Sequence, residues 1–159
     1  MPRILLCALT LALFARTTLA AGGGGGNVDF DDDVASHFVT DVSRDAVFAD
    51  SDSNKPIMVL VTQPWCGACK GLKRGVNAGT EVKGLLEKFT VVHAVGDDGQ
   101  QWQESGHGYV PQTYFFAPDG TTLSVEGPNP KYAHFFPNES TLVTGMKSAL
   151  DSYASHSEL

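Results

Sequence analysis

The chain has 159 residues, and its 18 acidic side chains outnumber its 11 lysines and arginines, which gives a formal net charge of −7 at pH 7. This length suits one compact domain with its own hydrophobic core. An acidic chain without a basic patch argues against nucleic acid as a partner.

The first twenty residues have the pattern of a secretory signal peptide. Arg3 supplies an early positive charge, an apolar run extends from Ile4 to Phe14, and small residues lead up to Ala20. The run is well short of the ~20 apolar residues that span a bilayer, so we expect no membrane span. Cleavage after Ala20, or after Ala21, would remove Cys7 and leave two cysteines.

Residues 21–36 are expected to form a disordered leader that is rich in glycine and aspartate. The run Gly22–Gly26 has no side chains to bury and a high backbone entropy. The acidic cluster from Asp29 to Asp33 lacks the glycine and the terminal glutamate of a calcium loop, so a solvated acidic segment is the favoured interpretation. The folded domain is then predicted over residues 37–155.

The domain is predicted to begin with a short strand, a helix and a buried strand. Residues 37–40 are typical of an edge strand, and Asp41 or Ser43 is suited to cap a helix over residues 46–49. The continuous apolar run Ile57–Thr62 predicts a strand buried on both faces, in a sheet with helices on each side.

The segment Trp65-Cys66-Gly67-Ala68-Cys69 follows this strand and leads into a predicted helix whose first turn begins at Cys66. Unpaired amide groups at a helix start and the helix dipole stabilise a thiolate, so we expect the Cys66 thiol to have a lowered pKa. Cys69 lies on the same helix face, within reach of a disulfide. The pair is therefore the candidate catalytic dithiol.

Two other interpretations of this cysteine pair are less favoured. A structural zinc site needs four ligands, and the chain has no second Cys-x-x-Cys and no closely spaced histidine pair, so no metal is predicted. An inert structural disulfide would close so short a loop that it would remove little chain entropy. Redox chemistry is the favoured interpretation.

The following segments predict alternating helices and strands. The helix continues past Cys69, weakened by glycines in its middle, and is followed by a helix over residues 81–88 and a strand over residues 89–95. His93 in that strand is expected to be a core or surface residue with a structural rather than a catalytic role, because nothing in the sequence pairs with it. In the polar insertion that follows, Trp102 and His107 are candidate rim residues.

The last third of the chain predicts a hairpin, a loop and a helix. Residues 112–116 and 121–125 are joined by a tight-turn sequence, which predicts an antiparallel hairpin. Three aromatic residues of the loop either pack in the core, which is the favoured interpretation, or contact clients: Tyr132, Phe135 and Phe136. Asn138 starts both the final amphipathic helix and an N-glycosylation sequon, so it is a candidate glycosylation site.

Together these segments resemble the thioredoxin superfamily over about Val39 to Ser152. The resemblance lies in four stretches: Lys55–Leu60, Trp65–Lys70, Gly108–Pro111 and Pro118–Gly120. More narrowly, the Cys-Gly-Ala-Cys tetrapeptide and the terminal Glu-Leu are similar to small endoplasmic-reticulum oxidoreductases related to the anterior gradient proteins. The resemblance implies an α/β thioredoxin fold, with a central mixed sheet flanked by helices on both faces.

The resemblance also assigns roles around the dithiol. The matching proline in this superfamily is cis and lies against the cysteines, so Pro111 is expected to be cis, with Val110 offering its backbone to an extended substrate peptide. Trp65, Gly67 and Ala68 are expected to support the active site. Two positions depart from the family pattern: Leu60 replaces a buried acid, and Arg74 replaces a kinking proline.

The expected function is thiol-disulfide exchange with cysteine-containing client proteins, in which Cys66 attacks and Cys69 resolves the mixed disulfide, without a cofactor. Glutathione or a lumenal oxidoreductase would serve as the redox partner. The alternative is a chaperone-like module that binds clients with little redox turnover; a reductive donor is less favoured in an oxidising compartment.

The terminal His156-Ser157-Glu158-Leu159 is similar to an endoplasmic-reticulum retrieval signal, although Ser157 replaces the acidic residue. A retrieval receptor is therefore an expected partner, and residues 156–159 are expected to form a tail. We expect the lumen of the endoplasmic reticulum, with secretion as the alternative.

Overall fold

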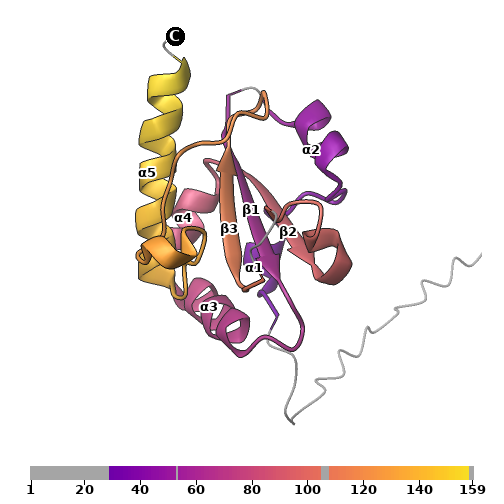
Figure 1. Cartoon of the computed structure of the whole chain (residues 1–159), viewed down its shortest axis with the longest axis vertical. Helices are drawn as coiled ribbons and strands as arrows, with labels where there is room; N and C mark the ends of the chain where they lie inside the picture. Colours follow the sequence, from indigo (N-terminus) through magenta and orange to yellow (C-terminus); the bar gives the residue numbers. More distant parts are fainter. Residues whose placement is uncertain (1–28, 53, 105–107, 158–159) are drawn as a thin grey trace, which may run out of the picture.

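A computed structural model describes residues 29–52, 54–104 and 108–157 of the protein. Helical segments separate the strands along the chain (Figure 1). In chain order the elements are α1 (Asp32–Ala35), α2 (Arg44–Asp50), β1 (Ile57–Thr62), α3 (Gly67–Ala78), α4 (Thr80–Leu86), β2 (Thr90–Val95), the 3₁₀ turn η1 (Gly96–Gly99), β3 (Gln112–Phe116), the 3₁₀ turn η2 (Pro130–Tyr132) and α5 (Glu139–Ser157).

The named strands form a mixed three-stranded sheet in the order β2-β1-β3. β1 pairs with β2 in parallel, with Ile57 opposite Thr90, and with β3 antiparallel, with Ile57 opposite Phe116. The parallel pair requires a crossover, which α3 and α4 supply. The predicted mixed sheet is confirmed.

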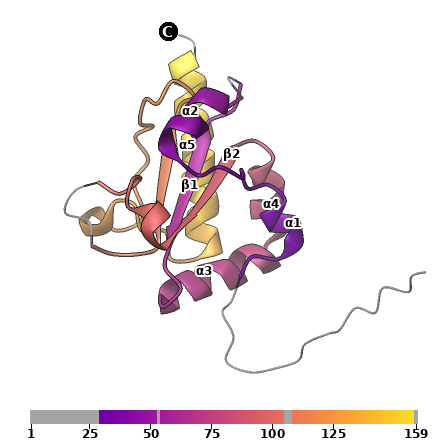
Figure 2. The ribbon, with the colours of Figure 1, turned by 90° about the vertical axis from the view of Figure 1, so that its right-hand side faces the viewer.

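Side chains of β1 alternate between two hydrophobic cores. Met58 and Leu60 pack with residues of α1, α3, α4 and α5 on one face. Val59 and Val61 pack on the other face, with Val47 of α2. Helices therefore lie on both faces of the sheet, and this explains the uninterrupted apolar run of the central strand (Figures 1 and 2).

The prediction of a disordered leader over residues 21–36 is wrong for residues 29–36. Val34 of α1 is completely buried, and Phe30 packs against the same core. α1 lies beside the C-terminal end of α3 (Figure 2), where the Asp31 amide donates to Asn77 Oδ1 over 3.0 Å. The two apolar side chains anchor a segment whose acidic residues are mostly at the surface. Residues 21–28 lie outside the described residues.

Two predicted strands are replaced by single bridges. Residues 37–40 contribute one parallel bridge, between Phe38 and Val91. Residues 121–125 contribute one antiparallel bridge, between Phe116 and Thr122. The chain then leaves the sheet, because Gly127 donates its N–H to the carbonyl of Ala133 and closes a loop that leads to α5.

The glycines that predicted a weak helix permit a close approach between helices. α3 is continuous up to Ala78, and the chain turns into α4 at the extended residue Gly79. A Cβ atom on Gly75 would lie 3.1 Å from Glu139 Cβ, and one on Gly79 would lie 2.8 Å from Glu139 Cγ. Glycine thus allows α5 to begin directly against the end of α3.

Most of the predicted targeting segments at the two ends of the chain lie outside the described residues. The signal-peptide prediction for residues 1–20 and the terminal Glu158 and Leu159 lie outside the described residues. Within the described residues, no helix combines the length and apolar character needed to cross a membrane. α5 continues through His156 and Ser157, so the first half of the predicted 156–159 tail is helical.

Candidate redox site

The two cysteines lie where the central strand gives way to α3. The Cys66 amide donates to the Gln63 carbonyl over 3.1 Å, which turns the chain after β1. Cys66 is the N-cap of α3. Cys66 and Cys69 are joined by a disulfide, with their Cα atoms 5.3 Å apart. The spacing read from the sequence therefore places the two sulfurs as expected.

The helix start directs a hydrogen-bond donor at the Cys66 sulfur. The Cys69 N–H donates to Cys66 Sγ over 3.0 Å. When the disulfide is reduced, the same N–H and the positive end of the helix dipole stabilise a thiolate on Cys66. Cys69 is only 1% exposed, whereas the neighbouring Trp65 is 75% exposed and Gly67 and Ala68 are also at the surface. Cys66 is also buried, at 4% exposed, but it is the more exposed of the two cysteines, so we expect an incoming sulfur to approach from its side.

The Val110-Pro111 segment packs against this sulfur. The peptide bond between the two residues is cis, which confirms the expectation for Pro111. The Val110 carbonyl oxygen lies 3.5 Å from Cys66 Sγ. In the disulfide that sulfur carries no proton, so this is a contact, while a reduced Cys66 thiol can donate to the same oxygen. Val110 is half-buried and leaves part of its surface beside the disulfide.

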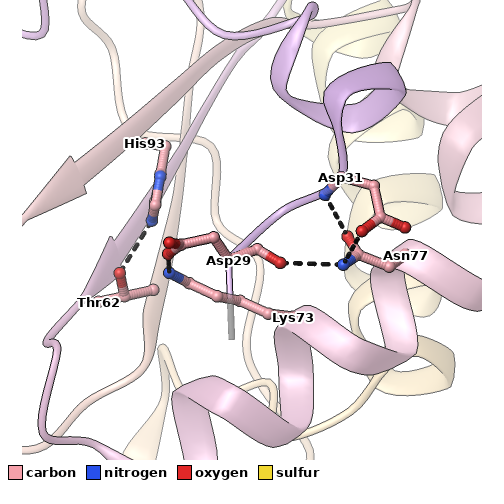
Figure 3. Close-up of polar contacts among 6 residues, drawn as sticks. All are labelled: Asp29, Asp31, Thr62, Lys73, Asn77 and His93. Carbon is pink, nitrogen blue, oxygen red and sulfur yellow. Dashed lines mark hydrogen bonds and ion pairs between the residues drawn. The ribbon is translucent and has the colours of Figure 1, made fainter. Parts of the chain in front are cut away.

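A polar cluster joins α3 to the N-terminal segment (Figure 3). Lys73 Nζ lies 3.2 Å from Asp29 Oδ1, and the lysine side chain is only 9% exposed. Asn77 Nδ2 donates to the Asp29 carbonyl and to Asp31 Oδ1, each over 3.0 Å. Lys73 and Asn77 lie one helical turn apart, so one face of α3 holds the segment that precedes α1.

His93 is part of the packing next to this cluster. Its Nε2 lies 2.8 Å from Thr62 Oγ1, and its ring packs edge-on against Phe30. Burial, followed by the positive charge of Lys73, lowers the pKa of His93 to about 4, so the imidazole is neutral at pH 7. These contacts agree with the structural role expected for it, although the sequence showed no partner.

The ion pair between Lys73 and Asp29 was not predicted from the sequence. A signal was present, because Lys73 lies four residues after Cys69, on the stripe of α3 that also carries the buried Leu72 and Val76. A lysine on a buried stripe requires a counter-charge, but its partner is 44 positions away and could not be identified from local spacing.

The candidate rim residues are placed differently. Trp102 is buried, and its Nε1 donates to the Val42 carbonyl over 3.0 Å, so the expectation of a rim position is wrong. Its large apolar ring fills the core between the sheet and α2. His107 lies outside the described residues. Of the three loop aromatics, Phe136 is in the core, whereas Tyr132 and Phe135 are half-buried next to Val110.

Asp33 and Asn138, two of the remaining acidic and polar candidates, have structural partners. Among the described residues, no group of three or more His, Cys, Asp or Glu side chains is placed to hold a metal ion. In the acidic cluster, Asp33 pairs with Lys83 over 2.7 Å. Asn138 accepts a hydrogen bond from the Thr141 amide over 3.0 Å and caps α5. Its glycosylation stays a prediction.

A mixed sheet with helices on both faces and a Cys-x-x-Cys disulfide at a helix N-terminus defines a thioredoxin-fold protein of the disulfide-oxidoreductase type. The family model described as thioredoxin-like matches residues 39–118, which is half of the chain. The protein therefore belongs to the thioredoxin-like family.

Solved structures with similarity to this chain include two bacterial proteins. A disulphide isomerase from Xylella fastidiosa Temecula1 is 16% identical, with 71% of this chain and 84% of that chain covered and a TM-score of 0.39. A thioredoxin-fold protein from Helicobacter pylori is 13% identical, with 72% of this chain and 97% of that chain covered and a TM-score of 0.41.

Proposed function

We propose that this protein is a thiol-disulfide oxidoreductase of the endoplasmic-reticulum lumen that exchanges disulfides with client proteins through Cys66 and Cys69. One observation carries the proposal. The Cys66 sulfur accepts an N–H at the start of α3 and lies 3.5 Å from the backbone of Val110. On reduction, a Cys66 thiolate would be stabilised beside a backbone that can hold an extended chain.

The oxidising direction proceeds in two exchange steps. A client thiolate attacks Cys66 Sγ, the Cys66–Cys69 bond breaks, and Cys69 leaves as a thiolate that takes up a proton. A second client thiolate then attacks the client sulfur of the mixed disulfide and releases Cys66 as a thiolate. Two electrons pass from the client to the protein, which ends as the Cys66/Cys69 dithiol. Oxidised glutathione, or a lumenal oxidoreductase in its disulfide form, then takes up these two electrons by the same exchange and restores the Cys66–Cys69 disulfide.

The reverse sequence reduces a client disulfide. The Cys66 thiolate attacks, a mixed disulfide forms, and Cys69 resolves it by attacking Cys66 Sγ. Gly67 and Ala68 lie at the surface and add little side-chain bulk beside the pair, while Cys66 itself is only 4% exposed. The potential of the dithiol relative to its redox partner decides which direction dominates.

The exchange is tested with the oxidised protein and a reduced peptide that contains two cysteines, followed by mass after free thiols are trapped. Cys66→Ser should abolish peptide oxidation, because no sulfur remains to accept the client. Cys69→Ser should instead accumulate a mixed disulfide between Cys66 and a disulfide-containing client, because resolution is lost. Full activity in the Cys66→Ser variant would contradict the assignment.

Two sequence features support the lumenal location: the predicted signal peptide at residues 1–20 and the retrieval-like tail at residues 156–159. The Cys-Gly-Ala-Cys tetrapeptide and the terminal Glu-Leu are also similar to those of thioredoxin domain-containing protein 12. In eukaryotic cells that express the full chain, deletion of residues 156–159 should raise the amount of protein in the medium. Equal secretion with and without these residues would contradict a retrieval role.

A mass loss on endoglycosidase treatment would show whether Asn138 is modified.

The second candidate is a client-binding module with little turnover. It is favoured by Trp65, whose ring is largely exposed beside the disulfide and offers apolar surface without any exchange. A variant with Cys66→Ser and Cys69→Ser separates the two functions. Undiminished binding of an unfolded client, together with failure of the native protein to oxidise the cysteine peptide, would favour this module.

A further inference from the structure

An apolar cleft opens beside the candidate redox site. Its walls are Tyr109, Val110, Tyr132 and Phe135, and its volume is about 230 Å³. The ring centroids of Tyr109 and Tyr132 are 5.1 Å apart, and those of Tyr109 and Phe135 are 6.2 Å apart. Three aromatic rings and one aliphatic side chain therefore converge on one small space.

Val110 connects this cleft to the reactive sulfur. Its side chain is a wall of the cleft, and its carbonyl oxygen lies 3.5 Å from Cys66 Sγ. A client sulfur in exchange with Cys66 must lie next to that residue. The neighbouring residues of the client chain then pass directly over the cleft, since consecutive Cα atoms are ~3.8 Å apart.

We propose that this cleft is a specificity subsite, which binds a bulky apolar side chain, such as leucine or phenylalanine, next to the reacting cysteine of a client. The inference rests on the proposed oxidoreductase function and names the class of client that it prefers. Such clients are unfolded or partly folded chains, because in folded proteins apolar side chains next to cysteines are usually buried.

The chemistry of the walls favours an apolar occupant. All four walls contribute apolar surface, and the Tyr109 hydroxyl is already engaged, because the His134 amide donates to it over 3.1 Å. The volume is below the ~300–1,000 Å³ of pockets for drug-sized ligands, so the cleft suits one side chain. A serine there would gain little, whereas leucine would remove apolar area from water on both partners.

The test compares single-turnover oxidation of reduced dicysteine peptides by the oxidised protein. The peptides are identical except for leucine or serine next to the reactive cysteine, placed before it in one pair and after it in another. The native protein should oxidise one of the leucine peptides about 10-fold faster than its serine counterpart, as expected for partial burial of one apolar side chain. Tyr132→Ala should reduce this ratio to about 2-fold or less.

Three controls keep the result interpretable. Phe135→Leu is a milder second variant, in case Tyr132→Ala lowers the melting temperature. Tyr153→Ala is the matched aromatic control: its side chain is also half-buried, but it lines a separate hollow with Phe48 and Asp119, and should leave the ratio unchanged. The rate with dithiothreitol, which has no flanking side chain, should be the same in all variants.

The outcomes separate the subsite from the proposed function. Equal rates for leucine and serine peptides in the native protein, with normal reaction towards dithiothreitol, would overturn the subsite but not the function. An unchanged preference in folded Tyr132→Ala and Phe135→Leu variants would also overturn it. Failure to react with dithiothreitol as well as the peptides would overturn the proposed function itself.

Discussion

The ion pair between Lys73 and Asp29 gives a direct test of the N-terminal segment as part of the domain. The two groups lie 3.2 Å apart, but the Lys73 side chain is 9% exposed and the Asp29 side chain 70% exposed. Removing the carboxylate leaves a buried ammonium without its counter-charge. Removing the ammonium leaves a carboxylate that water can solvate. The two substitutions should therefore have unequal effects.

The expected magnitudes follow from this asymmetry. Breaking a fully buried pair costs about 3–5 kcal/mol and breaking an exposed one about 0–1 kcal/mol, so Asp29→Asn should lower the free energy of unfolding by about 1–2 kcal/mol. Lys73→Met keeps the aliphatic stem and removes the buried charge. It loses the contact with the Phe30 ring, whose centroid lies 5.3 Å from Nζ. The net change should stay within about 1 kcal/mol.

Urea unfolding of the oxidised protein at pH 7 measures both effects. In the Lys73→Met background, Asp29→Asn should cost almost nothing, because the charge that it leaves unpaired is gone. Asp32→Asn removes an acid from the same segment and serves as the control for net charge. Two results together would refute this prediction: a free energy of unfolding for Asp29→Asn equal to that of the native protein, and a loss of several kcal/mol for Lys73→Met.

Three further predictions test the packing around the site. The His93 pKa is lowered from 6.5 to about 4 in the folded protein. As the pH falls from 6.5 to about 4, unfolded chains therefore take up a proton that folded chains do not, and the free energy of unfolding should drop by at most about 3 kcal/mol. His93→Gln should remove that part of the pH dependence and His37→Gln should not; an unchanged slope in both would contradict the burial. Gly145→Ala should lower the free energy of unfolding by about 1–3 kcal/mol, because the new Cβ would lie 2.5 Å from Phe136 Cε1. Gly84→Ala has open space around it and should raise the free energy of unfolding by about 0.5–1 kcal/mol. Thermal unfolding that ranks the two variants in the opposite order would refute this. Among the described residues, Thr113 Oγ1 is buried without a hydrogen-bond partner, so Thr113→Val should leave the melting temperature equal or higher, and a clear loss would reveal a partner for the hydroxyl.

The features predicted correctly from the sequence are those that local order determines. The Cys66–Cys69 spacing brings two sulfurs to one helix face whatever the rest of the chain does. The apolar run Ile57–Thr62 is long enough to require burial on both sides. The cis bond before Pro111 followed from the family resemblance, because a Val-Pro sequence alone is trans in most proteins.

The features that were missed depend on contacts between distant residues. α1 is only four residues long and buries one of them, Val34, so it is too short to show a periodic apolar pattern in the sequence. Lys73 and Asp29 pair across 44 positions. The burial of Trp102 depends on α2, which lies far earlier in the chain and supplies neighbours that no local pattern reveals.

The most direct test of the central claim is the equilibrium between the Cys66/Cys69 dithiol and a series of glutathione redox buffers, read by mass after free thiols are trapped. We expect one reversible two-electron transition that disappears in Cys66→Ser. A midpoint near the lumenal poise of about −180 to −210 mV would indicate an oxidase or isomerase, and one near about −270 mV a reductase. Cysteines that keep one state throughout the series would contradict the claim that this pair exchanges disulfides.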